Sequence, residues 1–229
     1  MFKSEFIVFE NHFYIISRKG EKGRMMNYIW LFFIGSFLGD VIETLYCRIV
    51  EGVWMSRSSV VWGPFSIVWG LGIVLATVFL SKYKDKSDMV LFIAGSLLGG
   101  FYEYACSIFT EVAFGKVFWE YSHIPFNLGG RINLLYCLFW GIASVVWIKK
   151  LYPKFMSLIE KIPEKIGKIS VGAIVVFMST NIVVSGLALI RSTERSHDIE
   201  AKTVWQQFMD ERFPDERIEK IYPNMIQVK

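Results

Sequence analysis

Two glutamates stand at matching positions in two apolar stretches of similar sequence, and they are the residues best placed for chemistry. Residues 35–51 read GSFLGDVIETLYCRIVE and residues 95–111 read GSLLGGFYEYACSIFTE, so that Glu43 falls on Glu103. A carboxylate in hydrocarbon is costly and normally faces a partner or a water-filled cavity. Such a pair can bind a cation, exchange protons or receive a polar substrate.

Further polar residues are expected to join this pair as substrate-binding groups. Asp40 lies just before Glu43, whereas Gly100 occupies the matching position in the second stretch. The connections after the two stretches supply the remaining candidates: Arg57, Glu120, Tyr121, Asn127 and Arg131. The Arg131 guanidinium can pair bidentately with Glu43, Glu103 or Glu120.

The sequence shows no ligand pattern for a metal or a cofactor. The histidines are far apart in the sequence, and the cysteines lie in apolar stretches, where they are expected to be small buried hydrophobes (His12, His123, His197; Cys47, Cys106, Cys137). The chain contains no Gly-x-x-x-x-Gly-Lys-Ser/Thr phosphate loop, so ATP hydrolysis would need a separate subunit. No catalytic, cofactor-binding or metal-binding residue is therefore predicted.

The elements that must position these residues are membrane-spanning helices. Hydrophobic residues make up 53% of the chain and its mean hydropathy is +0.40, both high for a soluble domain. A spanning helix needs about 20 mostly apolar residues. Five stretches qualify, namely 27–50, 60–80, 89–113, 132–148 and 169–190. Trp140 and Trp147 are expected to anchor the fourth, short stretch at the membrane interfaces.

The predicted fold class is an all-α membrane protein with about five transmembrane helices and two tandem, parallel helix-loop-helix repeats. The repeats cover about 27–80 and 89–148. In each of them a Gly-x-x-x-Gly pair, Gly35/Gly39 or Gly95/Gly99, precedes the glutamate by about one helical turn. Membrane helices approach closely at such small residues, so both glutamates are predicted to face the bundle interior.

Four regions are predicted along the chain. They are a cytoplasmic N-terminal segment (1–26), the duplicated membrane domain (27–150), a cytoplasmic loop with the fifth helix (151–190) and an amphipathic C-terminal tail (191–229). In the tail, Trp205, Phe208, Met209 and Phe213 recur at helical spacing before Pro214. This pattern predicts a short helix that docks on the membrane domain.

Basic residues predict the topology, because cytoplasmic loops of membrane proteins are rich in Lys and Arg. These residues gather in the N-terminal segment and in the loops 81–88 and 149–168. By contrast, 51–59 holds Arg57 and 114–131 holds Lys116 and Arg131. We therefore expect a multi-pass protein of a bacterial cell membrane with a cytoplasmic N-terminus. The loops 51–59 and 114–131, and with five spans also the tail, are expected outside.

The connections and the helix starts after them carry two long motifs in order. The first is Gly63-Pro64-Phe65 followed by Trp69-Gly70; the second is Trp119-Glu120-Tyr121-Ser122, Pro125-Phe126-Asn127-Leu128, Gly130-Arg131-Ile132 and Trp140-Gly141. Over about 28–152 the chain resembles the bacterial membrane family named putative ABC-transporter type IV, or CmpB-like. Ser58, Ser66-Ile67, Phe118 and Glu120 depart from its usual residues. The resemblance implies a permease, and the fifth stretch and the tail lie outside it.

Three functions remain open at the level of the sequence. The first is a transporter or permease-like subunit with a central acidic and arginine site that opens to the outer face. Five spans are few for a complete carrier, so a homodimer or a separate ATPase subunit is an expected partner besides the lipid bilayer, and no nucleic acid is expected. The second is a membrane scaffold or regulatory protein in which the charges only fix helix packing. The third is an outer-face membrane enzyme using Glu120, Tyr121, His123 and Arg131.

Overall fold

The computed structural model describes residues 21–228, and about 71% of this part is helical. The predicted cytoplasmic segment therefore lies mostly outside the described residues. The helices are α2 (Glu21–Val50), α3 (Ile67–Leu80), α4 (Asp88–Phe114), α5 (Leu134–Val146), α6 (Tyr152–Ile159), α7 (Glu164–Ser196), α8 (Val204–Arg212) and α9 (Asp215–Ile221). Two-residue strands form two small antiparallel pairs, β1 (Lys116–Val117) with β4 (Ile226–Gln227) and β2 (Asn127–Leu128) with β3 (Ile132–Asn133).

Within the described residues, four helices are long and apolar enough to cross a membrane. They cover Gly23–Val50, Asp88–Phe114, Leu134–Ile159 and Glu164–Ser196, and Ile67–Tyr83 is a shorter apolar helix. This architecture fits a membrane protein. The second predicted stretch, 60–80, is only partly helical, because Gly63 has a positive φ of 79° and is followed by Pro64. A helix tolerates neither feature in its interior, so α3 starts only at Ile67.

The fourth predicted stretch is longer than expected. The helix of α5 continues through a π-helical turn (Trp147–Leu151) into α6, which ends at Ile159. Pro153 is tolerated because it lies in the first turn of α6. Much of the predicted loop 149–168 is therefore helical, and residues 160–163 connect α6 to α7.

Both tryptophans that were predicted to lie at the membrane interfaces have their indole rings packed inside the helix bundle. Trp147 is buried and its indole N–H donates to Thr77 Oγ1 on α3, 2.9 Å away. Trp140 points into the bundle, where it contacts Gly99 and Glu103 on α4. Hydropathy alone does not distinguish an interior tryptophan from one at the membrane surface, because both lie in apolar sequence.

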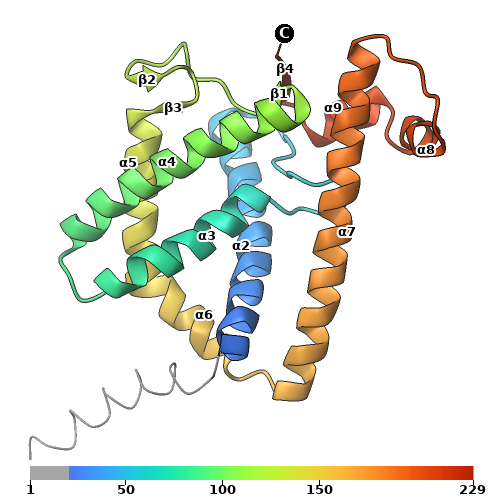
Figure 1. Cartoon of the computed structure of the whole chain (residues 1–229). Coiled ribbons are helices and arrows are strands. Elements are labelled where there is room, and N and C mark those ends of the chain that lie inside the picture. The colour runs from blue at the N-terminus through green and yellow to red at the C-terminus, as the bar shows by residue number, and fades with distance from the viewer. Residues whose placement is uncertain (1–20, 229) are drawn as a thin grey trace, which may run out of the picture.

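The membrane helices form two closely packed hairpins, α2 with α3 and α4 with α5 (Figure 1). Gly39 on α2 lies directly against the Trp69 side chain of α3, and Gly99 on α4 lies in the same way against Trp140 of α5. A side chain at either glycine would occupy the space of the indole. The small-residue stripes predicted from the sequence therefore are the surfaces at which each hairpin closes.

The tail folds back onto the C-terminal end of α7. The predicted short helix is α8, which ends before Pro214, and a second helix, α9, follows it. Met209, Phe213, Ile218 and Tyr222 pack into one buried cluster with Ala188 and Leu189 of α7 and Val61 of the loop between α2 and α3. The β1–β4 pair joins the last described residues to the end of α4, so the tail lies at the same end of the bundle as the connections that follow α2 and α4 (Figure 1).

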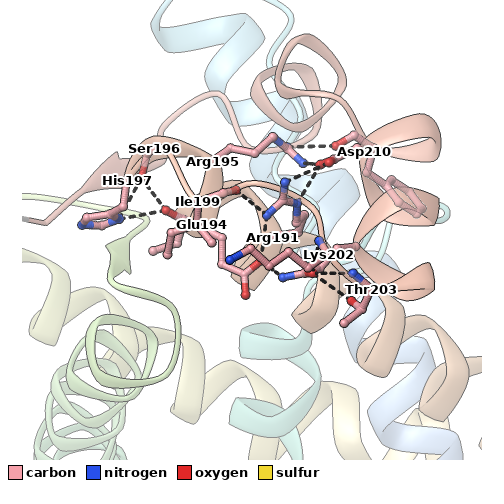
Figure 2. Close-up of polar contacts among 12 residues, drawn as sticks. Arg191, Glu194, Arg195, Ser196, His197, Ile199, Lys202, Thr203 and Asp210 are labelled. Atoms are coloured by element: carbon pink, nitrogen blue, oxygen red, sulfur yellow. Dashed lines mark hydrogen bonds and ion pairs between the residues drawn. The ribbon is translucent and has the colours of Figure 1, made fainter.

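Ion pairs fix this tail to α7. Figure 2 shows Arg191 and Arg195 of α7 reaching Asp210 of α8. Arg191 donates from Nε and Nη2 to the two oxygens of Asp210, at 2.8 and 2.9 Å, and Arg195 Nη1 donates to Oδ1 at 2.7 Å. Arg195 also pairs with Asp215. The hydrogen bonds from Arg191 and Arg195 hold the pKa of Asp210 and Asp215, respectively, below the usual range.

Candidate functional site

Glu43 of α2 is held by one residue from the loop between α2 and α3 and one from α3. The indole N–H of Trp69 donates to Glu43 Oε2 at 2.9 Å, and Arg57 Nε donates to Oε1 at 2.8 Å. Arg57 Nη2 forms a salt bridge with the same oxygen. Burial opposes the charge of Arg57, but the neighbouring Glu43 carboxylate outweighs it and raises the pKa of Arg57. The predicted site residues Glu43 and Arg57 therefore form an ion pair.

Glu103 of α4 has the same indole contact but a different second partner. The Trp140 N–H donates to Glu103 Oε2 at 3.0 Å, and the Tyr121 hydroxyl donates to Oε1 at 2.8 Å. Glu103 is only 7% exposed. Burial first, and then the Glu103 carboxylate, raise the pKa of Tyr121. Across residues 21–228 no Lys, Arg or His forms a salt bridge with Glu103.

Local sequence explains why the two indoles reach the two glutamates. Gly39 precedes Glu43 by about one helical turn and Gly99 precedes Glu103 in the same way, so each glycine and its glutamate share a face of the helix. Because the glycines have no side chain, the indole rings lie against the helix backbone. Each N–H then meets the carboxylate one turn further along.

The two halves of the site meet through these rings. The ring centroids of Trp69 and Trp140 lie 5.2 Å apart with an interplanar angle of 35°. The contacts therefore run from Glu43 through both indoles to Glu103, and the two carboxylates interact electrostatically. Tyr102 supports this arrangement, because its hydroxyl donates to the Val68 carbonyl at 2.9 Å and its ring packs edge-on against Trp140.

Asp40 lies beside the Glu43–Arg57 pair and is buried, with 4% of its surface exposed. It interacts electrostatically with both residues of the pair. Its Oδ1 atom has no hydrogen-bond partner in the part of the chain that the structure describes. Asp40 thus adds a second carboxylate on the α2 side, where α4 has Gly100.

The other predicted residues of the second connection lie elsewhere. Arg131 does not pair with Glu43, Glu103 or Glu120; its guanidinium instead donates to Ser107 Oγ at 3.0 Å and forms a salt bridge with Glu111. Glu111 lies two helical turns beyond Glu103, about 12 Å along α4 at 1.5 Å per residue. Arg131 comes directly before β3, and α5 begins only after β3. Arg131 therefore lies beside Glu111 near the end of α4, and not beside Glu103.

Glu120 and Asn127 form hydrogen bonds within the connection between α4 and α5. Ser122 donates to Glu120, and this hydrogen bond holds the pKa of Glu120 below its usual range. Asn127 donates to the Ile124 carbonyl at 2.8 Å and accepts from the Gly130 backbone N–H at 3.0 Å. His123 is exposed and points at Glu120 from 3.9 Å. The four residues considered for an outer-face enzyme are therefore divided among three separate places.

A comparison with protein-family models then places the chain among known proteins. The model of the family described as "Putative ABC-transporter type IV" (ABC_trans_CmpB) matches residues 30–186. The chain belongs to this family. Searches of the curated proteins and of the solved structures gave no match. The match extends beyond the resemblance over 28–152 that the motifs indicated, because it includes most of α7.

This family segment contains two residues of α7 that support the site and whose role the sequence did not reveal. Asn181 accepts from the Trp62 backbone N–H at 3.1 Å and donates to the Trp62 carbonyl at 2.7 Å, and Ser185 Oγ accepts from the Val61 N–H at 2.9 Å. Buried backbone groups outside a helix need such hydrogen-bond partners. The loop that carries Arg57 is thereby fixed between α2 and α7.

A small cavity lies beside Trp140. Gly99 and Tyr102 also line it, and its volume is about 10 Å³, about the room that one water needs. A larger groove of about 350 Å³ lies between α2 and α6, and it is lined by apolar side chains such as Phe33, Phe37 and Phe155. The carboxylates of Asp40, Glu43 and Glu103 line neither space.

Proposed function

We propose that this chain is a permease-like membrane subunit that moves protons or a small cation through a central site built on Glu43, Glu103 and Arg57. The observation that carries the proposal is the pair of carboxylates joined through two indole rings in contact, one from each hairpin. Ionisable groups inside membrane helices commonly mark ion pathways. The family description, a putative ABC transporter, supports the same class of function.

The matching contacts of the two hairpins support a tandem, parallel duplication. Trp69-Gly70 and Trp140-Gly141 correspond in structure, because Gly70 packs on Ser36 and Phe32 just as Gly141 packs on Ser96 and Phe92. A site between two parallel repeats is typical of one class of transporters. In this proposal α3 is a fifth, short span, and its preceding loop 60–66 enters the membrane from the outer side.

The proposed orientation places the N-terminus in the cytoplasm and both connections outside the bacterial cell membrane. The tail then lies outside as well, since its helices pack with Val61 of the first connection. The Glu43–Arg57 pair is partly exposed, with 27% and 18% of the two side chains open, so it forms the outer mouth of the site. We propose a second copy or a separate ATPase subunit as partner.

Transport in proteoliposomes tests the proposal. The full chain is reconstituted, uptake of labelled sodium, rubidium and magnesium is measured, and a trapped dye reports internal pH under an imposed pH gradient. We expect at least one flux above that of empty vesicles, lost in Glu43→Gln and in Glu103→Gln. Glu111→Gln is the matched control, because Glu111 lies on α4 but pairs with Arg131 outside the central site. No flux above empty vesicles would favour the membrane scaffold instead.

A further inference from the structure

We propose that Asp40 and Glu103 are proton-binding groups of the central site, whereas Glu43 is held in its ion pair with Arg57. The binding of protons stands on the geometry of these residues. Its link to transport rests on the proposed function, which it makes more specific by naming the proton as the bound ion.

The inference starts from the charges that the site brings together. Three carboxylates, those of Asp40, Glu43 and Glu103, interact with one another or with Arg57. Arg57 commits its Nε and Nη2 to Glu43. Among residues 21–228 no second cation forms a salt bridge with this group. If all three carboxylates were ionised, two negative charges would stand uncompensated among membrane helices, which is energetically unfavourable.

The contacts of Asp40 and Glu103 show where the compensating charge binds. Asp40 Oδ1 is buried and has no hydrogen-bond donor among the described residues. Leaving a neutral carboxyl unpaired costs far less than leaving a carboxylate unpaired. Glu103 accepts one bond on each oxygen, from neutral Tyr121 and Trp140 donors, and has no cation beside it.

Geometry favours protons over a metal ion. No group of three or more His, Cys, Asp or Glu residues within the described ranges is arranged to hold a metal ion. A proton needs no set of ligands: it comes from water and forms one O–H bond on a carboxylate oxygen. Releasing it restores the carboxylate, and no redox partner takes part.

Several titratable groups face these two carboxyls and would influence their titration. Glu43 and Arg57 face Asp40. The groups around Glu103 come from its own helix, from α5, from the second connection and from α2: Cys106, Cys137, Tyr136, Tyr121 and Glu43. Apart from Glu43, all of them are neutral at neutral pH, so none compensates a Glu103 carboxylate.

Infrared spectroscopy of the full chain in lipid bilayers tests the inference, because a protonated carboxyl has its own carbonyl stretching band. We expect this band in the wild type at neutral pH and its loss at alkaline pH. Asp40→Asn and Glu103→Gln should each remove about half of it, while Glu111→Gln should leave it unchanged. If Asp40→Asn fails to insert, Asp40→Gly copies the matching Gly100 and should have the same effect. A wild type without the band, or a band that these variants do not reduce, would overturn the inference.

The two proposals fail in different ways. If the protein shows the carbonyl band of protonated carboxyls but gives no flux in proteoliposomes, the proposal of proton-binding groups is supported and the proposed transport function is wrong. If cation flux depends on Glu43 and Glu103 but the carbonyl band is absent, the proposal of proton-binding groups is wrong and the proposed permease function stands.

Discussion

The Arg57–Glu43 ion pair should couple the outer loop to α2 by about 1–3 kcal/mol. Breaking a fully buried pair costs about 3–5 kcal/mol, whereas exposed pairs contribute about 0–1 kcal/mol. The side chains of Arg57 and Glu43 are 18% and 27% exposed and joined through two nitrogens, so their coupling belongs between these limits. Trp69 retains one hydrogen bond to the carboxylate when Arg57 is removed, which limits the loss.

A double-mutant cycle measures this coupling. Arg57→Gln, Glu43→Gln and the double variant are unfolded with SDS in mixed micelles, and the coupling is the departure from additivity. The exposed Lys168–Glu164 pair, with 62% and 80% of its side chains open, serves as the control and should couple by less than about 1 kcal/mol. If the effects of the Arg57 and Glu43 substitutions on the free energy of unfolding add within about 0.5 kcal/mol, the reasoning is refuted.

Three further predictions concern the surroundings of the site. Asn181→Leu should cost about 1–3 kcal/mol in the same unfolding assay, since it leaves both backbone groups of Trp62 unpaired; an unchanged midpoint would contradict this. Gly99→Ala should cost about 1–3 kcal/mol by displacing Trp140, and an unshifted tryptophan emission spectrum would speak against that displacement. Because the pKa of Asp210 is lowered in the fold, its stabilising contribution is complete above about pH 4 and is lost as the pH falls through the lowered value. Protease cleavage of the tail should therefore rise in acid, and equal cleavage at all pH values would count against the ion-pair account.

The inward direction of both glutamates was predictable, because a glycine one turn before each of them marks the side on which helices approach. The indole partners were not. Trp69 and Trp140 stand before a glycine in each hairpin, and that repeated Trp-Gly pair was the one available signal. Hydropathy assigned Trp140 to the interface because it records only that the surrounding residues are apolar.

The ends of the helices were less predictable from the sequence than the number of helices. The stretch 60–80 is apolar throughout, yet Gly63-Pro64 excludes a helix there, so the start of α3 depends on two residues within an otherwise uniform segment. The prediction that Arg131 pairs with Glu43, Glu103 or Glu120 was wrong for a related reason. Which carboxylate an arginine reaches depends on the level at which its helix begins, and the hairpin of β2 and β3 sets that level only in three dimensions.

The measurement that tests the central claim most directly is thermal unfolding of the detergent-purified protein across pH and in sodium, potassium and magnesium chlorides. Wild type is compared with Glu43→Gln and Glu103→Gln. If the acidic pair is a binding site, a change of pH or one of the cations stabilises the wild type, and the effect is absent from both folded variants. If nothing shifts the wild type and both variants unfold early, the two glutamates only hold helices together, and the claim of a binding site is wrong.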